Sequence, residues 1–324
     1  MTAPKKNTYS WKWIAIAVPA ACAGVALLTY KQAYSMMHFT TNGERTPIPE
    51  ELSLLEKLRV AMRGINIPKP STPGVPSDLS PETHPVEIRA SDGATLSAWY
   101  SPVDGANSLV ILFHGYGDDK VALLREAKAF RDLGCAVMPV DCRGYGKSSE
   151  SYTTIGYREA MDVAAALEYA RENFSYGRVI LYGQSMGSAA ILRAIAKYNI
   201  AADGIIIEGV FDRLLNAVRN RFPSMGFPSF PCAELLVFWG GRFFGFNGFA
   251  HNPVEYASNV SCPALVMHGE HDPRALASEA MSVFSNLRGP KQYREFPGVG
   301  HESYLVCNPE EWKATVRQFF ASLK

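Results

Sequence analysis

The feature that most limits how this chain folds is a regular alternation of short apolar runs with longer helix-like stretches. The apolar runs are residues 108–113, 136–141, 178–182, 204–208 and 264–268. The helix-like stretches are 119–133, 157–173, 186–198, 275–287 and 309–323. Runs that are apolar on both faces and separated by helices indicate parallel strands covered on both sides. Residues 84–324 are therefore expected to form one α/β domain around a mostly parallel sheet.

Two segments do not follow this alternation of apolar runs and helix-like stretches. Residues 84–90 and 94–100, joined at Ser91-Asp92-Gly93, predict an antiparallel hairpin before the first parallel strand. Residues 211–252 are rich in Phe, Gly and Pro and contain no clear strand. They fall between two expected strands, which favours an inserted cap above the carboxyl edge of the sheet. An ordinary loop with one packed helix is the alternative.

The N-terminal part of the chain contains a candidate membrane span. Residues 13–30 carry no charge, and as a helix they would be roughly 27 Å long, close to the hydrocarbon thickness of a bilayer. A retained anchor is favoured over two alternatives, a signal peptide cleaved after an A-x-A match at 21–23 and a buried soluble helix. Three lysines lie within residues 1–12, so we expect a cytoplasmic N-terminus and a catalytic domain on the other side. Cleavage would instead give a secreted protein.

A connecting segment, residues 31–83, is expected between the span and the domain. Residues 31–48 are expected to be a linker that leaves the span. Residues 48–64 have the spacing of a short amphipathic helix that Gly64 closes. Residues 67–81 are proline-rich and predict an extended linker without a core of its own.

Charge and cysteine content exclude several classes of protein. The chain has 32 Lys plus Arg against 31 Asp plus Glu, which argues against a nucleic-acid-binding protein that relies on a basic field. The cysteines, at 22, 135, 142, 232, 262 and 307, form no CxxC pair and no metal-ligand spacing. We therefore expect buried free thiols, no structural metal and no organic cofactor. The oligomeric state is left open.

The segment GQSMG, residues 183–187, lies where an apolar strand pattern changes into a helix pattern. A sharp turn between the two elements lifts the Ser185 hydroxyl off the sheet and leaves no room for side chains two residues to either side. This is the G-x-S-x-G nucleophile elbow in the strand–turn–helix context that it requires. The sequence thus predicts Ser185 as a nucleophile, with the Met186 N–H at the helix start as an oxyanion donor.

A serine nucleophile needs a base to take its proton. His301 follows the last expected strand and a glycine-rich loop, on the same sheet edge as Ser185, and is the predicted base. His114 also follows a strand, but His-Gly-Tyr-Gly there is better suited to present the Tyr116 N–H as a second oxyanion donor. The remaining histidines lack such a setting.

The base in turn needs a carboxylate that holds its tautomer. Asp272 follows the penultimate strand and is the predicted acid. Glu208, at the end of another expected strand, is a serious alternative, and Glu270 lies in the same loop as Asp272. The order Ser, Asp, His along the chain is the one expected for this fold.

From about residue 84 to its end the chain resembles the α/β-hydrolase superfamily, and within it membrane-associated serine hydrolases of the BEM46-like and ABHD13-like type. The matching motifs, in order, are HGYGDD (114–119), DCRGYGKSS (141–149), GQSMG (183–187), HGEHD (268–272) and GVGHE (298–302). The resemblance implies nucleophile Ser185, acid Asp272, base His301 and oxyanion donors Tyr116 and Met186. It implies a structural role for Arg143 and Asp141, with Arg143 a weak candidate to bind a substrate carboxylate. Residues 211–252 match no motif, so no substrate can be carried over.

The expected reaction is hydrolysis of a carboxylester or lipid acyl bond through an acyl-enzyme intermediate. A peptidase or amidase of the same fold is the first alternative. An aminopeptidase would need acidic residues for the substrate amine, and the cap region offers few beyond Glu234 and Glu255. The second alternative is a membrane-tethered binding protein without activity, although no triad residue and no elbow glycine is missing.

Overall fold

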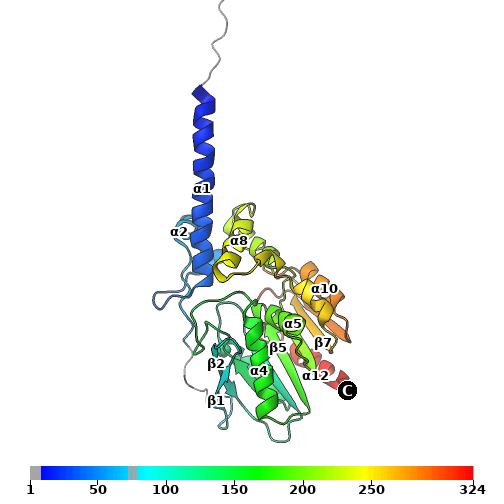
Figure 1. Ribbon diagram of the computed structural model, residues 1–324. Coiled ribbons are helices and arrows are strands. Elements are labelled where there is room, and N and C mark those ends of the chain that lie inside the picture. The colour runs from blue at the N-terminus through cyan, green and yellow to red at the C-terminus, as the bar shows by residue number, and fades with distance from the viewer. Residues whose placement is uncertain (1–8, 72–73, 75–78, 324) are drawn as a thin grey trace, which may run out of the picture.

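The fold is built on an eight-stranded sheet in the order β1-β2-β4-β3-β5-β6-β7-β8. The computed structural model describes residues 9–71, 74 and 79–323, and its ribbon is shown in Figure 1. The strands are β1 (His84–Arg89), β2 (Thr95–Tyr100), β3 (Ser108–Phe113), β4 (Ala136–Val140), β5 (Arg178–Gln184), β6 (Gly204–Glu208), β7 (Ala264–Gly269) and β8 (Lys291–Phe296). Strand β2 pairs antiparallel with β1 and with β4, and all other pairs are parallel. The predicted hairpin and mostly parallel sheet are confirmed.

Strand β8 is the one strand of the sheet that neither the apolar runs nor the predicted hairpin included. Its sequence is KQYREF, and only its last residue, Phe296, is buried. An edge strand pairs on one side only and faces solvent, so it does not need the continuous apolar run of a central strand.

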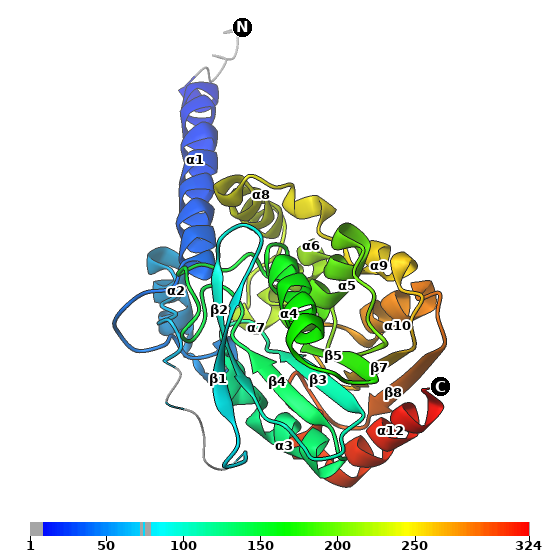
Figure 2. The ribbon, with the colours of Figure 1, turned by 60° about the horizontal axis from the view of Figure 1, so that its bottom comes forward.

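Two helical layers cover the sheet, because alternate residues of the central strands point to opposite faces. On one face α4 (Glu159–Asn173), α5 (Met186–Tyr198) and α10 (Ala277–Asn286) pack in the larger core cluster. On the other face α3 (Leu124–Asp132) and α12 (Pro309–Ser322) pack in a second cluster. Figure 2 shows these two layers on either side of the strands. Shorter helical elements are η2 (Lys120–Leu123), α9 (Pro253–Tyr256), η4 (Ala257–Asn259) and α11 (Tyr304–Cys307).

The N-terminal helix α1 (Tyr9–Met37) is longer than the expected span. Residues 31–37, expected to be a linker, are helical, and this expectation was wrong. The reason is packing: the end of α1 lies against α8 (Cys232–Phe244), where Tyr30 makes an edge contact with Trp239 at 5.3 Å between ring centroids. Ala15–Met37 is long and apolar enough to cross a membrane, and only 6% of its most apolar window is buried.

The connecting segment contains η1 (Pro49–Glu51) and α2 (Leu54–Arg63). A capping box at Ser53 starts α2, since the Ser53 and Glu56 side chains bond reciprocally to each other's backbone N–H. Gly64 follows the last turn at φ +92°. Of the expected cytoplasmic segment 1–12, residues 1–8 lie outside the described residues, as do 72–73 and 75–78 of the proline-rich stretch 67–81.

Residues 211–252 are helical and lie between β6 and β7 in the chain. They form α6 (Leu214–Arg219), α7 (Phe222–Met225), α8 and η3 (Gly248–Ala250). Their apolar side chains share a core cluster with Ala189 of α5 and with Ala275. Because Ala189 is one turn beyond Ser185, this cluster places the inserted helices, called the cap below, beside the expected nucleophile.

The cysteines differ in their burial. All six are free thiols. Cys135 and Cys142 are buried as expected, whereas Cys22 and Cys307 are exposed and the other two are half-buried. The expectation of buried thiols was therefore wrong for the four cysteines that do not flank β4. Cys22, for example, lies on the exposed helix α1.

The turn after β4 contains a buried ion pair. Arg143 donates from Nε and Nη2 to Asp162 Oδ1, at 2.9 and 2.7 Å, and also bonds to Asp92. The side chain of Arg143 is 1% exposed and that of Asp162 is fully buried. Burial raises the pKa of Asp162 to about 7, although the Arg143 charge opposes this rise. Arg143 is thus engaged within the fold and has a structural role.

This pair generates a prediction on stability. Arg143→Ala would leave the buried Asp162 carboxyl without its partner, which typically costs about 3–5 kcal/mol of unfolding free energy. The control is Arg171→Ala, which removes an exposed pair with Asp203 at 3.8 Å and should cost less than about 1 kcal/mol. Urea unfolding in detergent would measure both. Equal effects of the two substitutions would contradict the structural role.

Candidate active site

Ser185 lies at a strained turn between β5 and α5. Its φ is +49° and its ψ is −105°, a backbone conformation that a residue with a side chain adopts only when its surroundings enforce it. The flanking glycines make this possible. A Cβ atom on Gly183 would stand 2.6 Å from the Gly187 carbonyl carbon, and one on Gly187 would stand 2.3 Å from the Phe113 oxygen. Both positions therefore require glycine.

The structure brings Ser185, His301 and Asp272 together in one hydrogen-bonded chain. His301 Nε2 is 3.1 Å from Ser185 Oγ, and His301 Nδ1 is 2.6 Å from Asp272 Oδ2. Ser185 follows β5, Asp272 follows β7 and His301 follows β8, so all three stand at the carboxyl edge of the sheet. The side chain of His301 is 16% exposed and that of Asp272 is fully buried.

Three donors surround the Asp272 carboxyl group. Its Oδ2 faces His301, and its Oδ1 accepts from the backbone N–H groups of Arg274 and Ala275, at 2.8 and 3.0 Å. Burial opposes ionisation of this group, but the hydrogen bonds and the His301 charge outweigh it and hold its pKa below the usual range. Asp272 is therefore ionised where it orients the imidazole.

Glu208, the alternative acid, does not contact His301. Its Oε1 accepts from Trp312 Nε1 at 2.6 Å, and its Oε2 lies 3.4 Å from Gln184 Nε2. Gln184 Nε2 is also 3.2 Å from Glu126 Oε1. Burial, and then the negative charge of Glu126, raise the pKa of Glu208 to about 8. The Glu208 carboxyl group therefore lies next to Gln184, the residue before Ser185, and makes no hydrogen bond to the imidazole. Glu270, in the Asp272 loop, accepts from the Gly298 N–H instead.

The two expected oxyanion donors lie beside Ser185. A Cβ atom on Gly115 would stand 3.8 Å from Ser185 Cβ, so the loop after β3 passes next to the serine. Met186 is the first residue of α5. Within the described part of the chain, no group accepts a hydrogen bond from the N–H of Tyr116 or of Met186. Both donors are thus available to a bound oxygen atom.

The Tyr116 side chain links this loop to the N-terminal helix. Its hydroxyl donates to the carbonyl of Met36, in the last turn of α1, at 2.5 Å. Arg45 Nη1 donates to the Gly117 carbonyl at 3.0 Å. Residues that precede the hydrolase domain therefore hold the loop that follows β3. The spacing of residues in the sequence contains no signal for these long-range contacts.

Two other histidines, His114 and His251, form hydrogen bonds within the fold. His114 is fully buried, its Nδ1 lies 2.8 Å from the Gly115 carbonyl, and its Nε2 accepts from the Cys142 N–H. His251 is also buried, and burial lowers its pKa to about 3. Neither lies in hydrogen-bonding distance of Ser185.

Two arginines near Asp272 were not singled out in the sequence. Asn220 of the cap donates to the Arg274 carbonyl at 3.2 Å, which places the neighbouring Arg221 beside the Asp272 loop. Burial and then the charge of Arg274 lower the pKa of Arg221. The nearby Tyr116 and Asp272 side chains oppose this shift. Among the described residues no carboxylate lies within 4.0 Å of either guanidinium group. Two guanidinium groups therefore lie on the cap side of the site.

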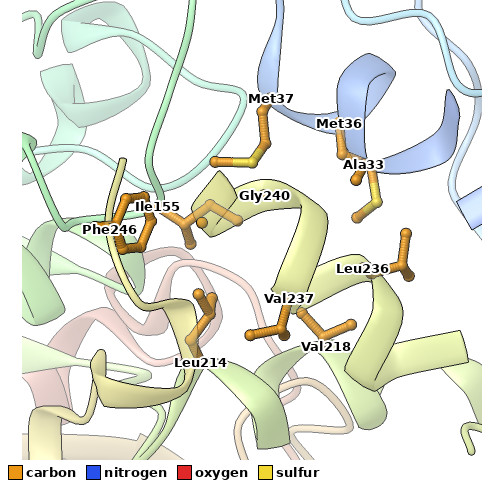
Figure 3. A pocket seen from close by; sticks show the side chains of 11 residues that line it. Ala33, Met36, Met37, Ile155, Leu214, Val218, Leu236, Val237, Gly240 and Phe246 are labelled. Atoms are coloured by element: carbon orange, nitrogen blue, oxygen red, sulfur yellow. The ribbon is translucent and has the colours of Figure 1, made fainter. Parts of the chain in front are cut away.

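A small cavity of about 30 Å³ lies between α1 and the cap (Figure 3). Apolar side chains of α1, α6 and α8 point into it from different sides, and Ile155 and Phe246 close it. Its lining residues from α1 are Ala33, Met36 and Met37. Met36 thus borders the cavity and accepts the Tyr116 hydrogen bond at the same time.

The chain is similar in sequence to one family model and to several known proteins. The family model described as serine aminopeptidase, S33 (Hydrolase_4) matches residues 104–216. Protein bem46 of Schizosaccharomyces pombe is 25% identical over 254 residues, which are 76% of this chain and 79% of that protein. The lysophosphatidylserine lipase ABHD12 of Mus musculus is 23% identical over 248 residues, 68% of this chain and 58% of that protein.

Solved structures show the same fold. An esterase from Pyrococcus furiosus superimposes with a TM-score of 0.66 at 24% identity and covers 79% of this chain and 97% of its own. A bacterial membrane phospholipase A superimposes with a TM-score of 0.52 at 18% identity, covering 74% of this chain and 86% of its own. At these identities the likeness establishes the fold alone.

The position of Glu208 predicts how stability depends on pH. The folded chain keeps the Glu208 proton up to about pH 8, whereas an unfolded glutamic acid releases it near pH 4.3. The unfolded state therefore binds fewer protons between these values, and this group makes stability fall as pH rises. Glu208→Gln cannot ionise. We expect it to match the parent near pH 5 and to be more stable near pH 8, by on the order of 1–3 kcal/mol.

Urea unfolding in detergent at the two pH values would measure this difference. Glu172→Gln, on the exposed end of α4, is the matched control and should leave the pH dependence unchanged. A difference between Glu208→Gln and the parent that is the same at both pH values would contradict the prediction.

Proposed function

Since this chain is a BEM46-like member of the α/β-hydrolase superfamily, we propose that it is a serine esterase that cleaves carboxylester or lipid acyl bonds. The observation that carries the proposal is the hydrogen-bonded chain from Ser185 through His301 to Asp272. A hydroxyl, an imidazole and an ionised carboxylate in this order form the arrangement that activates a serine for acyl transfer.

The proposed reaction has two halves. Ser185 Oγ attacks the ester carbonyl while His301 Nε2 takes its proton, and Asp272 stabilises the imidazolium. The tetrahedral oxyanion accepts hydrogen bonds from the Tyr116 and Met186 N–H groups, each typically worth about 3 kcal/mol in the transition state. His301 then gives the proton to the leaving alkoxide, which leaves an acyl group on Ser185. A water molecule, deprotonated by His301, releases the acid and restores the serine.

The charges around the site favour an ester over an aminoacyl amide. An aminopeptidase needs free carboxylates for the substrate ammonium group. Glu234 pairs with Arg219 and Glu255 pairs with Arg213, both on the cap surface. Arg221 and Arg274, both half-buried, instead lie beside the Asp272 loop and would repel an ammonium group. Turnover of acyl esters against aminoacyl amides tests this preference directly.

We also propose that α1 is a retained membrane anchor, with the N-terminus cytoplasmic and the hydrolase domain on the other side. The exposed apolar surface of Ala15–Met37 supports this, and so does the packing of its last turns against the fold. If the anchor is retained, the protein should stay in the membrane pellet after alkaline carbonate extraction. Recovery of a shortened, soluble form would support signal-peptide cleavage.

The nucleophile is tested by substitution. Ser185→Ala should abolish turnover of p-nitrophenyl esters and labelling by a fluorophosphonate probe, because covalent catalysis is lost altogether. Ser282→Ala, an exposed serine on α10, is the matched control and should keep both. Persistent labelling of the Ser185→Ala protein at another serine would refute the assignment.

The link between Tyr116 and α1 should matter for the rate. Tyr116→Phe keeps the backbone N–H but removes the hydrogen bond to the Met36 carbonyl, which is worth about 1 kcal/mol. We expect kcat for p-nitrophenyl esters to fall roughly fivefold with KM little changed, because the oxyanion donor is less well held. Tyr176→Phe, which removes a hydroxyl contact with Tyr100, should leave kcat unchanged. Equal rates for both variants would show that the link is only structural.

A further inference from the structure

Helix α2 presents an apolar face that no other part of the described chain covers. Leu54, Leu55, Leu58 and Met62 are 69%, 75%, 40% and 60% exposed. Their spacing places them on one side of the helix, and none of the ten residues of α2 is buried. A contiguous exposed patch of this kind marks an interaction surface.

The patch is held in a fixed position. Gln32 of α1 donates to the carbonyls of Val60 and Ala61, the latter at 3.0 Å. Lys57 Nζ donates to the Ser224 carbonyl in α7, at 2.6 Å. Helix α2 is therefore hydrogen-bonded both to the expected membrane helix and to the cap. These bonds fix the orientation of its apolar face relative to α1.

Helix α8 carries an aromatic group in which Phe238 is exposed and Trp239 and Phe243 are half-buried. Phe238 is 49% exposed and packs edge-on against Trp239 at 5.0 Å between ring centroids. Tyr30 of α1 contacts both Trp239 and Phe243, at 5.3 and 5.1 Å. Tyr30 is itself 43% exposed, and tyrosine is one of the residues typical of the boundary between membrane and water.

Both helices lie at the depth where the lipid headgroups would be. The uncharged stretch 13–30 fills the hydrocarbon layer, so its boundary falls near Tyr30. Residues 31–37 extend roughly 10 Å beyond that boundary at 1.5 Å per residue, enough to cross a headgroup region of about 5–8 Å. Gln32 contacts α2 and Tyr30 contacts α8 in this interval. Figures 1 and 2 show α2 and α8 on either side of the lower end of α1.

The charges of α2 fit the same location. Lys57, Arg59 and Arg63 flank its apolar face, against a single acidic residue, Glu56, that is engaged in the capping box. Basic side chains beside an apolar face are the pattern of a helix that lies in the membrane interface, with its cations near the lipid phosphates.

We propose that α2 and the aromatic face of α8, together called the interfacial platform, lie in the headgroup layer of the leaflet that α1 enters. The site then takes its ester from that leaflet rather than from water. The cavity between α1 and the cap and the Tyr116–Met36 bond connect the platform to the loop beside Ser185. This inference rests on the proposed esterase function and specifies its substrate as a membrane-resident acyl ester.

The experiment compares two substrates on the full chain in phosphatidylcholine vesicles. One is p-nitrophenyl butyrate, which reaches the site from water, and the other is monooleoylglycerol, which stays in the bilayer. The triple variant L54E/L55E/L58E should lower monooleoylglycerol turnover at least tenfold and change butyrate turnover less than twofold. The matched control is M281E, at a 42% exposed methionine on the ten-residue helix α10, which should leave both unchanged.

A second measurement uses the unaltered protein and does not depend on activity. Vesicles that contain a phosphatidylcholine with a diazirine in its acyl chain are irradiated, and crosslinked peptides are identified by mass spectrometry. We expect crosslinks within residues 54–63 and 232–244, and none in α10. Absence of crosslinks in 54–63 overturns the platform, as does a loss of monooleoylglycerol turnover in M281E equal to that in the triple variant. Crosslinks at the expected places, with no turnover of either ester, would support the platform and refute the esterase.

Discussion

The strained turn at Ser185 is the constraint on which the rest of the site depends. A positive φ at a residue with a side chain costs on the order of 1–3 kcal/mol, and the surrounding sheet supplies the restraint. Strand β5 is hydrogen-bonded on both sides, to β3 and β6. The Ser185 N–H donates to the Glu208 carbonyl at 2.8 Å, and Ser188 Oγ donates to the Gly183 carbonyl at 2.7 Å. The serine hydroxyl therefore stands at a fixed place above the sheet edge.

Carboxyl groups around this edge have opposite protonation states because their neighbours differ. Asp272 accepts from one imidazole and two backbone N–H groups, so its charged form is favoured. Glu208 is buried beside another carboxyl group, Glu126, so its neutral form is favoured. Environments that separate two carboxyl groups in this way are what allow one of them to orient a base at neutral pH while the other keeps its proton.

The N-terminal helix contacts the loop of the proposed oxyanion donor Tyr116 and is also a candidate anchor. Its last turn accepts the Tyr116 hydrogen bond and lines the cavity next to the cap. Arg45, shortly after the helix, holds the Gly117 carbonyl. In the proposed membrane-bound arrangement, the same few residues would set both the distance of the domain from the bilayer and the position of an oxyanion donor. Anchoring and catalysis would then share one structural element.

The sequence by itself determined the sheet class, the elbow and the chain order of the proposed triad. These follow from local rules: apolar periodicity defines strands and helices, and glycines at 183 and 187 are required by a turn of that shape. It predicted Asp272 as the acid but left Glu208 as an alternative, because both follow strands that end at the same edge. Asp272 contacts His301 and Glu208 contacts Trp312, and such side-chain contacts exist only once the strands are in register.

Tertiary structure alone decided the extent of α1, the edge strand β8 and the position of two arginines near Asp272. Helix α1 continues to Met37 because residues far along the chain, in α8, pack against it. Strand β8 has no continuous apolar run because only one of its edges is paired. Arg221 stands beside Asp272 because the cap folds back over the sheet. Each of these three features depends on contacts between segments that are distant in the sequence. A periodic pattern within one segment does not encode which distant segment will pack against it.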